Sequence, residues 1–293
     1  MKIKESVPQK IFHKCNVCFM VLMIVVTLYP FMYVFFASLS NATLLMAHQG
    51  PLWFPIAPNL DAYEAVLKNK MIFSGYRNTV IILAISLILN IVLTSFGAYV
   101  LSRREIMIKK PLIIYIVFTM FFSGGLIPFY YVVTSLGMYD TLVAVILPSA
   151  INTFNLIILR TGFEGIPVSL EESAKLDGAG DLTILFKIMI PLTLPTIAVV
   201  ILYYAVATWN AWFHAMIFIR TRSLYPLQLV LREILIGCDT SIMENGADLG
   251  EAQAVSETIQ YAVIMVATMP VLMIYPFLQK YFVKGVLVGA VKG

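Results

Sequence analysis

The chain has 293 residues, of which 60% are hydrophobic and 12% are charged, with a formal net charge of +4. Soluble domains carry about 25% charged residues, so this composition excludes an ordinary soluble protein. A small positive charge on so apolar a chain does not indicate nucleic-acid binding, and membrane lipid is the expected surrounding.

Six apolar windows almost free of charged side chains follow one another along the sequence. Each is long enough for a membrane-spanning helix, which needs about 20 apolar residues, and most lack the polar stripe of a buried soluble helix. We therefore expect an all-α integral membrane protein with a single six-helix domain. The predicted helices cover residues 15–39, 78–101, 111–139, 141–160, 194–219 and 258–282, within a domain 15–282 that follows an N-terminal segment, 1–14, and precedes a tail, 283–293.

The first helix begins close to the N-terminus and has to be distinguished from a cleaved signal peptide. Its apolar stretch is longer than the core of about 7–15 residues in such a peptide, so we expect an uncleaved spanning helix. Cys15 and Cys18 have C-x-x-C spacing, but they begin this helix without other ligands nearby. We therefore expect no redox or metal role for them.

The segments between the helices differ in character. Residues 40–76 form a predicted outer loop rich in proline and aromatic residues, and the predicted outer loop 220–257 is the most polar region. The third helix contains Ser123-Gly124-Gly125 and Pro128, a combination that breaks or kinks helices. We therefore expect an interruption in this helix.

The distribution of Lys and Arg predicts the orientation in the membrane, because basic residues gather on the cytoplasmic side. Fourteen lie on the side that holds both termini and the loops after the second and fourth helices, against six on the other side. We therefore expect both termini in the cytoplasm.

The loop between the fourth and fifth helices, residues 161–193, carries the most ordered motif of the chain. Ser169, with Glu172 three residues later, has the spacing of a capping box that begins a helix. Gly178 can adopt the left-handed conformation that ends a helix, and Asp181 can cap a second helix. We expect a cytoplasmic helix–turn–helix in this loop.

The centre of this motif has small side chains with acids around them. A small centre with a charged rim suits a helix that seats in a groove of a partner protein. Local chemistry is equally consistent with a plain surface helix that has a capped start and a glycine end. The small residues are Ser173 and Ala174, and the acids are Glu171, Glu172 and Asp177.

The motif resembles the cytoplasmic signature of ABC-importer permeases, in its spacing of Glu172-Ser173-Ala174, Gly178 and Ile188-Met-Ile-Pro191. The string Leu170-Glu-Glu-Ser-Ala-Lys-Leu-Asp-Gly-Ala179 is similar to the carbohydrate-uptake, maltose-type branch, with Ser173 and Ile190 as mild departures. Residues 119–128, Trp209-Asn210 and the tail from Val283 resemble the polysaccharide and complex-oligosaccharide permeases of that branch, which include the smaller alginate-importer permease.

This resemblance implies a type I importer permease in the bacterial cytoplasmic membrane, with a coupling helix between the fourth and fifth spans. It implies a sister permease in a heterodimer, two ATPase subunits, and an extracytoplasmic substrate-binding protein that the outer loops 40–76 and 220–257 receive. In maltose-type relatives the tail of the equivalent permease enters the ATPase dimer interface, and residues 283–293 are expected to do the same. The implied coupling residues are Glu171, Glu172, Ser173, Ala174, Asp177 and Gly178.

The sequence lacks a phosphate-binding loop of the form G-x-x-x-x-G-K-[ST]. We therefore expect no enzyme activity and no cofactor in this chain, with ATP and Mg²⁺ bound by the ATPase subunits. The histidines His13, His48 and His214 are scattered, so no metal site is expected.

The fifth helix carries most of the candidates for a translocation path. Aromatic faces suit sugar rings, and polar groups within a span usually face the bundle interior or a water-filled path. Asn210 and His214 are four residues apart, so they share one face of a continuous helix. Aromatic residues also gather at membrane interfaces and Asn also bridges helices, so a structural role stays open for each candidate. The candidates are Tyr203, Tyr204, Trp209, Asn210, Trp212 and His214, with Asn152 and Asn155 from the fourth helix and Asn90 from the second.

Other classes of membrane protein make different demands on the sequence. A secondary transporter or channel is expected to carry acidic residues inside the membrane for ion coupling, and the six windows contain none. A membrane-embedded enzyme needs a cluster of catalytic groups, such as paired His or Asp, and none appears in the windows. A uronic-acid oligosaccharide as substrate rests on the resemblance alone.

Overall fold

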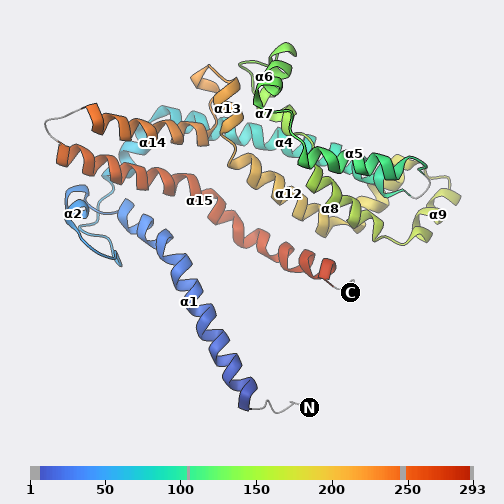
Figure 1. The fold of residues 1–293 in the computed structure, drawn as a ribbon, viewed down its shortest axis with the longest axis horizontal. Helices are drawn as coiled ribbons and strands as arrows, with labels where there is room; N and C mark the ends of the chain where they lie inside the picture. Colours follow the sequence, from blue (N-terminus) through green and yellow to red (C-terminus); the bar gives the residue numbers. More distant parts are fainter. Residues whose placement is uncertain (1–6, 104–105, 245–248, 291–293) are drawn as a thin grey trace. The chain divides into compact units, whose positions relative to one another are not determined.

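The computed structural model describes residues 7–103, 106–244 and 249–290. Within these ranges the chain is mainly helical and contains no strand, which confirms the expected all-α class (Figure 1). The ends of the predicted N-terminal segment and tail, residues 1–6 and 291–293, lie outside the described residues.

The chain divides into two units, and the first contains residues 1–70 and 231–270. It begins with α1 (Val7–Ser38), a long apolar helix in which only Ala37 and Ser38 are buried. A helix that is apolar all round and not covered by its own chain has the character of a lipid-facing span. Two short helices follow, α2 (Ala42–Ala47) and α3 (Asp61–Lys68).

A small apolar cluster holds the first unit together. Ala37 at the end of α1, Leu45 of α2 and Leu52 are all at most 8% exposed. Tyr33 of α1 and Tyr261 of α15 (Leu249–Ala290) pack against this cluster, with their ring centroids 6.0 Å apart in an edge-to-face arrangement. The segment after α1 is therefore folded onto the end of that helix.

The second unit contains residues 71–230 and 271–293, and its core lies between four long helices. Helix α8 packs against both α5 and α12 (Figure 1). Leu159 and Phe163 of α8 and Val200 of α12 are at most 1% exposed. The four helices are α4 (Lys70–Ser102), α5 (Lys109–Phe121), α8 (Thr153–Glu164) and α12 (Leu194–Trp209).

Glycine allows two of these helix pairs to approach closely. A β-carbon at Gly97 of α4 would lie 2.9 Å from Leu156 Cδ1, and one at Gly162 of α8 would lie 3.0 Å from Thr196 Cγ2. Small residues let the backbones of membrane helices come close together, so these two positions set the spacing of α8 from its neighbours.

Among the described residues, the candidates for the six expected spans are three continuous helices and three bent pairs. The continuous stretches are Val7–Ser38, Lys70–Ser102 and Ala254–Pro276. The bent pairs turn by 110° between α5 and α6 (Leu126–Ser135), by 46° between Val143–Ser149 and α8, and by 86° before α12. The predicted interruption at Ser123-Gly124-Gly125 is confirmed, because α5 ends at Phe121 and Gly125 has a φ of 86°.

Two other interruptions lie inside windows that we expected to be continuous. The window 141–160 contains α7 (Val143–Ile146), the 3₁₀ turn Leu147–Ser149 and then α8. The oxygen of the Asn152 side chain accepts the N–H of Asn155 and begins α8 as a new helix. The window 194–219 contains α12 and the separate α13 (Phe213–Phe218).

The segments predicted as outer loops contain helices of their own. After a 3₁₀ turn at Arg222–Leu224, α14 covers Leu227–Glu244 and α15 begins at Leu249. The polar composition of this region suggested a loop, but an amphipathic helix also contains many polar residues. The segment 40–76 likewise contains α2, α3 and the start of α4.

Candidate functional site

The predicted coupling segment folds as α9, which covers Val168–Leu176. Pro167 occupies its N-cap position, and no side chain caps this end. The predicted capping box of Ser169 and Glu172 is therefore wrong. Because the fixed φ of proline sets the entry two residues earlier than we expected, Ser169 lies inside the first turn of α9.

The end of α9 agrees with the prediction from Gly178. This residue has a φ of 80°, its N–H donates to the oxygen of Lys175 at 3.0 Å, and the N–H of Ala179 donates to the oxygen of Ala174 at 2.9 Å. These two bonds form a Schellman motif, which satisfies the last carbonyl groups of the helix.

The predicted coupling residues lie on different faces of α9. Ala174 is buried in the core of the second unit, and Glu171 is turned toward Arg103 at the end of α4. Successive residues of a helix are about 100° apart, so adjacent Ser173 and Ala174 do not form one exposed patch. Leu176, which sequence reasoning missed, is 89% exposed.

The outward face of α9 therefore consists of polar side chains around an exposed aliphatic group. Glu172, Ser173, Asp177 and Gly178 are exposed on it, next to Leu176. An apolar side chain surrounded by polar ones has the composition of a small protein-docking surface. We call these five residues the α9 outer face.

The second helix of the loop is present, and its geometry changes along its length. It consists of α10 (Asp181–Ile184), a π-helix at Leu185–Met189 and α11 (Ile190–Leu192). Gly180 is the N-cap of α10, so Asp181 is not the predicted cap. The Asp181 carboxylate instead accepts from Arg103 Nη2 at 2.9 Å and from the Tyr99 hydroxyl at 3.3 Å.

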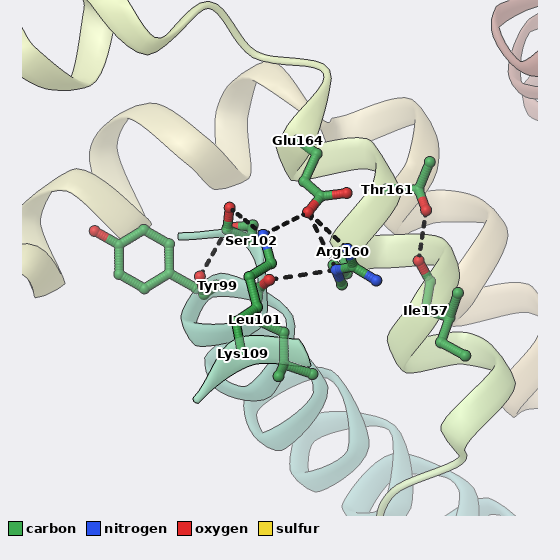
Figure 2. A network of polar contacts seen from close by, with 8 residues as sticks. All are labelled: Tyr99, Leu101, Ser102, Lys109, Ile157, Arg160, Thr161 and Glu164. Carbon is green, nitrogen blue, oxygen red and sulfur yellow. Dashed lines mark hydrogen bonds and ion pairs between the residues drawn. The ribbon is translucent and has the colours of Figure 1, made fainter. Parts of the chain in front are cut away.

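A second charged network joins the ends of three helices near this loop, as Figure 2 shows. The Glu164 carboxylate at the end of α8 accepts from Lys109 Nζ at 2.9 Å and from Arg160 Nη2 at 2.8 Å. Arg160 Nε also donates to the oxygen of Leu101, and Lys109 Nζ to that of Ser102, both at 3.3 Å. The network thus fastens the C-terminal ends of α4 and α8 to the start of α5.

Some of the predicted path residues line one cavity of about 440 Å³ between α4, α8 and α12, and others do not. Tyr203, Tyr204, His214, Asn152 and Asn155 are in its lining. Trp209, Asn210 and Trp212 are absent from it. The other lining residues are Asn90, Val145, Ser149, Ile151, Phe154, Ala207, Thr208 and Ala211.

The break between α12 and α13 explains this division. Asn210 is the C-cap of α12, where its side-chain nitrogen donates to the oxygen of Val206 at 2.9 Å, and Trp212 precedes α13. Asn210 and His214 therefore do not share a helical face, and our prediction of their common orientation is wrong. Trp209 is instead buried, with its ring 6.3 Å from that of Tyr76.

Tyr204 organises the wall of this cavity. Its side chain is 3% exposed, and its hydroxyl lies 2.8 Å from Thr94 Oγ1 of α4 and accepts the N–H of Asn152 at 2.9 Å. One buried hydroxyl thus connects α12 with α4 and with the start of α8. This residue has a structural role in addition to any contact with a ligand.

Elsewhere in the second unit, Asp140 fastens the turn between α6 and α7 to the segment after α13. Its carboxylate accepts from Thr221 Oγ1 at 2.6 Å and from the N–H groups of Thr221 and Arg220 at 2.8 Å each. The hydrogen bond from the Thr221 hydroxyl, together with the two from backbone N–H groups, lowers the pKa of Asp140.

We expect the Asp140→Asn substitution to remove a pH-dependent contribution to stability. The pKa of this carboxyl is lower in the folded protein, so its contribution is present above the unfolded value of about 3.9 and is lost as the pH falls through the folded pKa. At pH 7 the thermal midpoint of the variant should lie below that of the wild type. This difference in thermal midpoint should become smaller as the pH falls below about 4. A difference that is independent of pH would contradict this assignment.

Residues 110–288 match the family of binding-protein-dependent transport system inner membrane components. The match covers more than half of the chain, so the chain belongs to this family. It is a multi-pass component of the inner membrane, a permease of an ABC importer and not an enzyme.

Individual relatives cover almost the whole chain. The polygalacturonan/rhamnogalacturonan transport system permease protein of Bacillus subtilis (strain 168) is 42% identical over 94% of this chain and 96% of its own length. The protein LplC of the same organism is 39% identical over 97% of this chain and 96% of its own length. A chain from the crystal structure of a bacterial ABC transporter involved in the import of the acidic polysaccharide alginate aligns with a TM-score of 0.86 and 32% identity, covering 96% of this chain and 100% of that one.

Proposed function

We propose that this chain forms one half of the translocation path for an oligosaccharide or polysaccharide that contains uronic acids. The observation that carries the proposal is the likeness to two transporters of acidic polysaccharides. One relative is named for polygalacturonan and rhamnogalacturonan, and a structural neighbour belongs to an alginate importer.

The cavity between α4, α8 and α12 supports a sugar ligand in this proposal. Its described lining combines side-chain amides, hydroxyl groups and aromatic rings, including Asn152, Tyr203 and Phe154, without a Lys, Arg, Asp or Glu. Hydroxyl and amide groups bind sugar hydroxyls, and aromatic faces cover the C–H faces of the ring. This half of the path would therefore bind the neutral parts of the sugar, and cations of the sister subunit or the binding protein would bind the carboxylates.

The proposal includes an energy-coupling role for the α9 outer face. The face would seat in a cleft of an ATPase subunit, with Leu176 as its apolar centre and Glu172 and Asp177 as its charged rim. The complete importer would contain a sister permease, two ATPase subunits that bind ATP and Mg²⁺, and an extracytoplasmic binding protein. Both termini of this chain would lie in the cytoplasm, as the excess of basic residues predicts.

We expect the Glu172→Lys substitution to uncouple the assembled importer. A reversed charge in the rim of a small docking surface should weaken binding of the ATPase subunits at least about tenfold, which corresponds to about 1.4 kcal/mol. The measurement is ATP hydrolysis by the full complex in liposomes, with its binding protein and either an oligogalacturonate or a neutral glucan of equal length. Wild type should respond to the oligogalacturonate, and the variant should not.

The matched control is Lys110→Glu, a charge reversal at an exposed position of α5 that lies outside the α9 outer face. It should leave the response intact. An unchanged response in Glu172→Lys would overturn the docking assignment, and a response to the neutral glucan alone would overturn the assignment of the substrate class.

A further inference from the structure

Two acids of the coupling loop converge on a single guanidinium group. Arg103, directly after α4, forms an ion pair with Glu171 of α9, and its Nη2 lies 2.9 Å from Asp181 Oδ1 of α10. Only 12% of the Arg103 side chain and 18% of the Glu171 side chain are exposed. Two helices of the loop are thus held by one residue of the span that precedes them by more than 60 positions in sequence.

Tyr99 fixes the position of this guanidinium on α4. The Arg103 Cζ atom lies 4.0 Å from the centroid of the Tyr99 ring, a cation–π arrangement, and the Tyr99 hydroxyl donates to Asp181. Tyr99 itself is 6% exposed and belongs to the core of the second unit. Arginine suits such a site because its planar group can stack on a ring and bind two carboxylates at once.

The contact between α9 and α4 has an apolar part and an ionic part. Ala174 of α9 is buried in the same core cluster as Ala98 and Tyr99 of α4. Arg103 and Glu171 line a cavity of about 300 Å³, together with Pro167, Phe163 and Met189. Close packing transmits displacement and a cavity does not, so beside this cavity the ion pair supplements the small apolar contact of Ala174.

From Tyr99 the connection continues along α4 to the sugar cavity. Helix α4 is continuous from Lys70 to Ser102, so Tyr99 and Thr94 are about 7.5 Å apart along one rigid axis. The hydroxyl of Thr94 bonds to that of Tyr204, and Asn90, one turn further, lines the cavity. A contiguous set of contacts therefore runs from α9 to the cavity wall.

We propose that Arg103 is the positioning residue through which a displacement of α9 reaches α4 and, along it, the cavity wall. The proposal rests on the function proposed above and deepens it, because it specifies how the energy from the ATPase is transmitted within this subunit. Arg103 faces the interior of the loop and not the α9 outer face, so it acts on transmission and not on docking.

The test compares Arg103→Gln with wild type in the complete importer. We expect the variant to bind the ATPase subunits normally and to retain basal ATP hydrolysis, while the amount of sugar transported per ATP falls about tenfold, as for loss of a half-buried charge pair. Arg103→Lys, which keeps the charge but can serve only one carboxylate well, should give an intermediate ratio. Lys110→Gln, an exposed charge removal on neighbouring α5, should give the wild-type ratio.

A double-mutant cycle separates transmission from a general loss of structure. If Arg103 and Glu171 act as one link, the Arg103→Gln/Glu171→Gln pair should be no worse than the more affected single variant. Additive losses, or an unchanged transport ratio in Arg103→Gln, would overturn the proposal. Loss of ATPase binding in Arg103→Gln and Arg103→Lys would also overturn it, since it would make Arg103 part of docking. A wild-type complex without any response to sugar would instead contradict the proposed function.

Discussion

Valine in place of Gly162 is expected to force α8 away from α12 and to destabilise the second unit by about 2 kcal/mol. A β-carbon at this position would meet three atoms of Thr196, its Cγ2 at 3.0 Å, its Oγ1 at 3.1 Å and its Cβ at 3.2 Å. None of these is the far end of a flexible side chain, so the helices themselves would have to move. The measurement is the thermal midpoint of the purified protein in detergent.

The control for this prediction is the same substitution at Gly237 in α14. That glycine is also helical, and a β-carbon there would meet no atom within 4 Å, so valine should be tolerated. A Gly162→Ala/Thr196→Ala pair should recover most of the stability that Gly162→Ala loses, since two of the three close atoms are then absent. Equal effects of valine at Gly162 and Gly237 would contradict the close approach of α8 and α12.

Threonine in place of Gly178 is expected to abolish most coupled transport. A β-branched residue at a φ of 80° is an outlier, and the left-handed conformation costs an L-residue about 1–2 kcal/mol. The Schellman motif that ends α9 would open, and the residues of the α9 outer face would lose their fixed orientation. Transport per ATP should fall about tenfold in the reconstituted complex, while insertion in the membrane is retained.

Gly180 provides a matched control two residues further on. A β-carbon at either glycine would meet no atom within 4 Å, but the φ of −72° at Gly180 and its N-cap position suit threonine. Gly180→Thr should therefore transport normally. If both threonine variants behave alike, the left-handed conformation of Gly178 is not what the coupling segment requires.

The features that sequence reasoning predicted correctly depend on local chemistry. Gly178 ends a helix because a residue without a β-carbon takes a positive φ readily. Gly125 also has a positive φ, at the point where the Ser123-Gly124-Gly125 stretch interrupts a span. The six apolar windows predicted the class of protein, since every span needs its own apolar stretch. Each of these depends on residues that are close in sequence.

The features that it missed depend on contacts between distant residues. The break at Trp212 contains no glycine or proline, and it occurs where Trp212 packs on a cluster that includes Ile82 of α4 and Ala215. The partners of Asp181 lie about 80 residues earlier, so local reasoning assigned this carboxylate to a cap instead of to Arg103. Ser173 and Ala174 are adjacent, so they point to different sides of α9. Only the packed structure shows that Ala174 is the one that faces inward.

The π-helix at Leu185–Met189 has a consequence for reading related sequences. A single π-turn holds one residue more than the α-helix it replaces, so the residues on its two sides are out of α-helical register with each other. Leu185 and Met189 nevertheless both reach the core, and Phe186 and Lys187 between them are exposed. We therefore expect that a permease with an α-turn in place of this π-turn has one residue fewer here, as a change of helix winding and not of loop length.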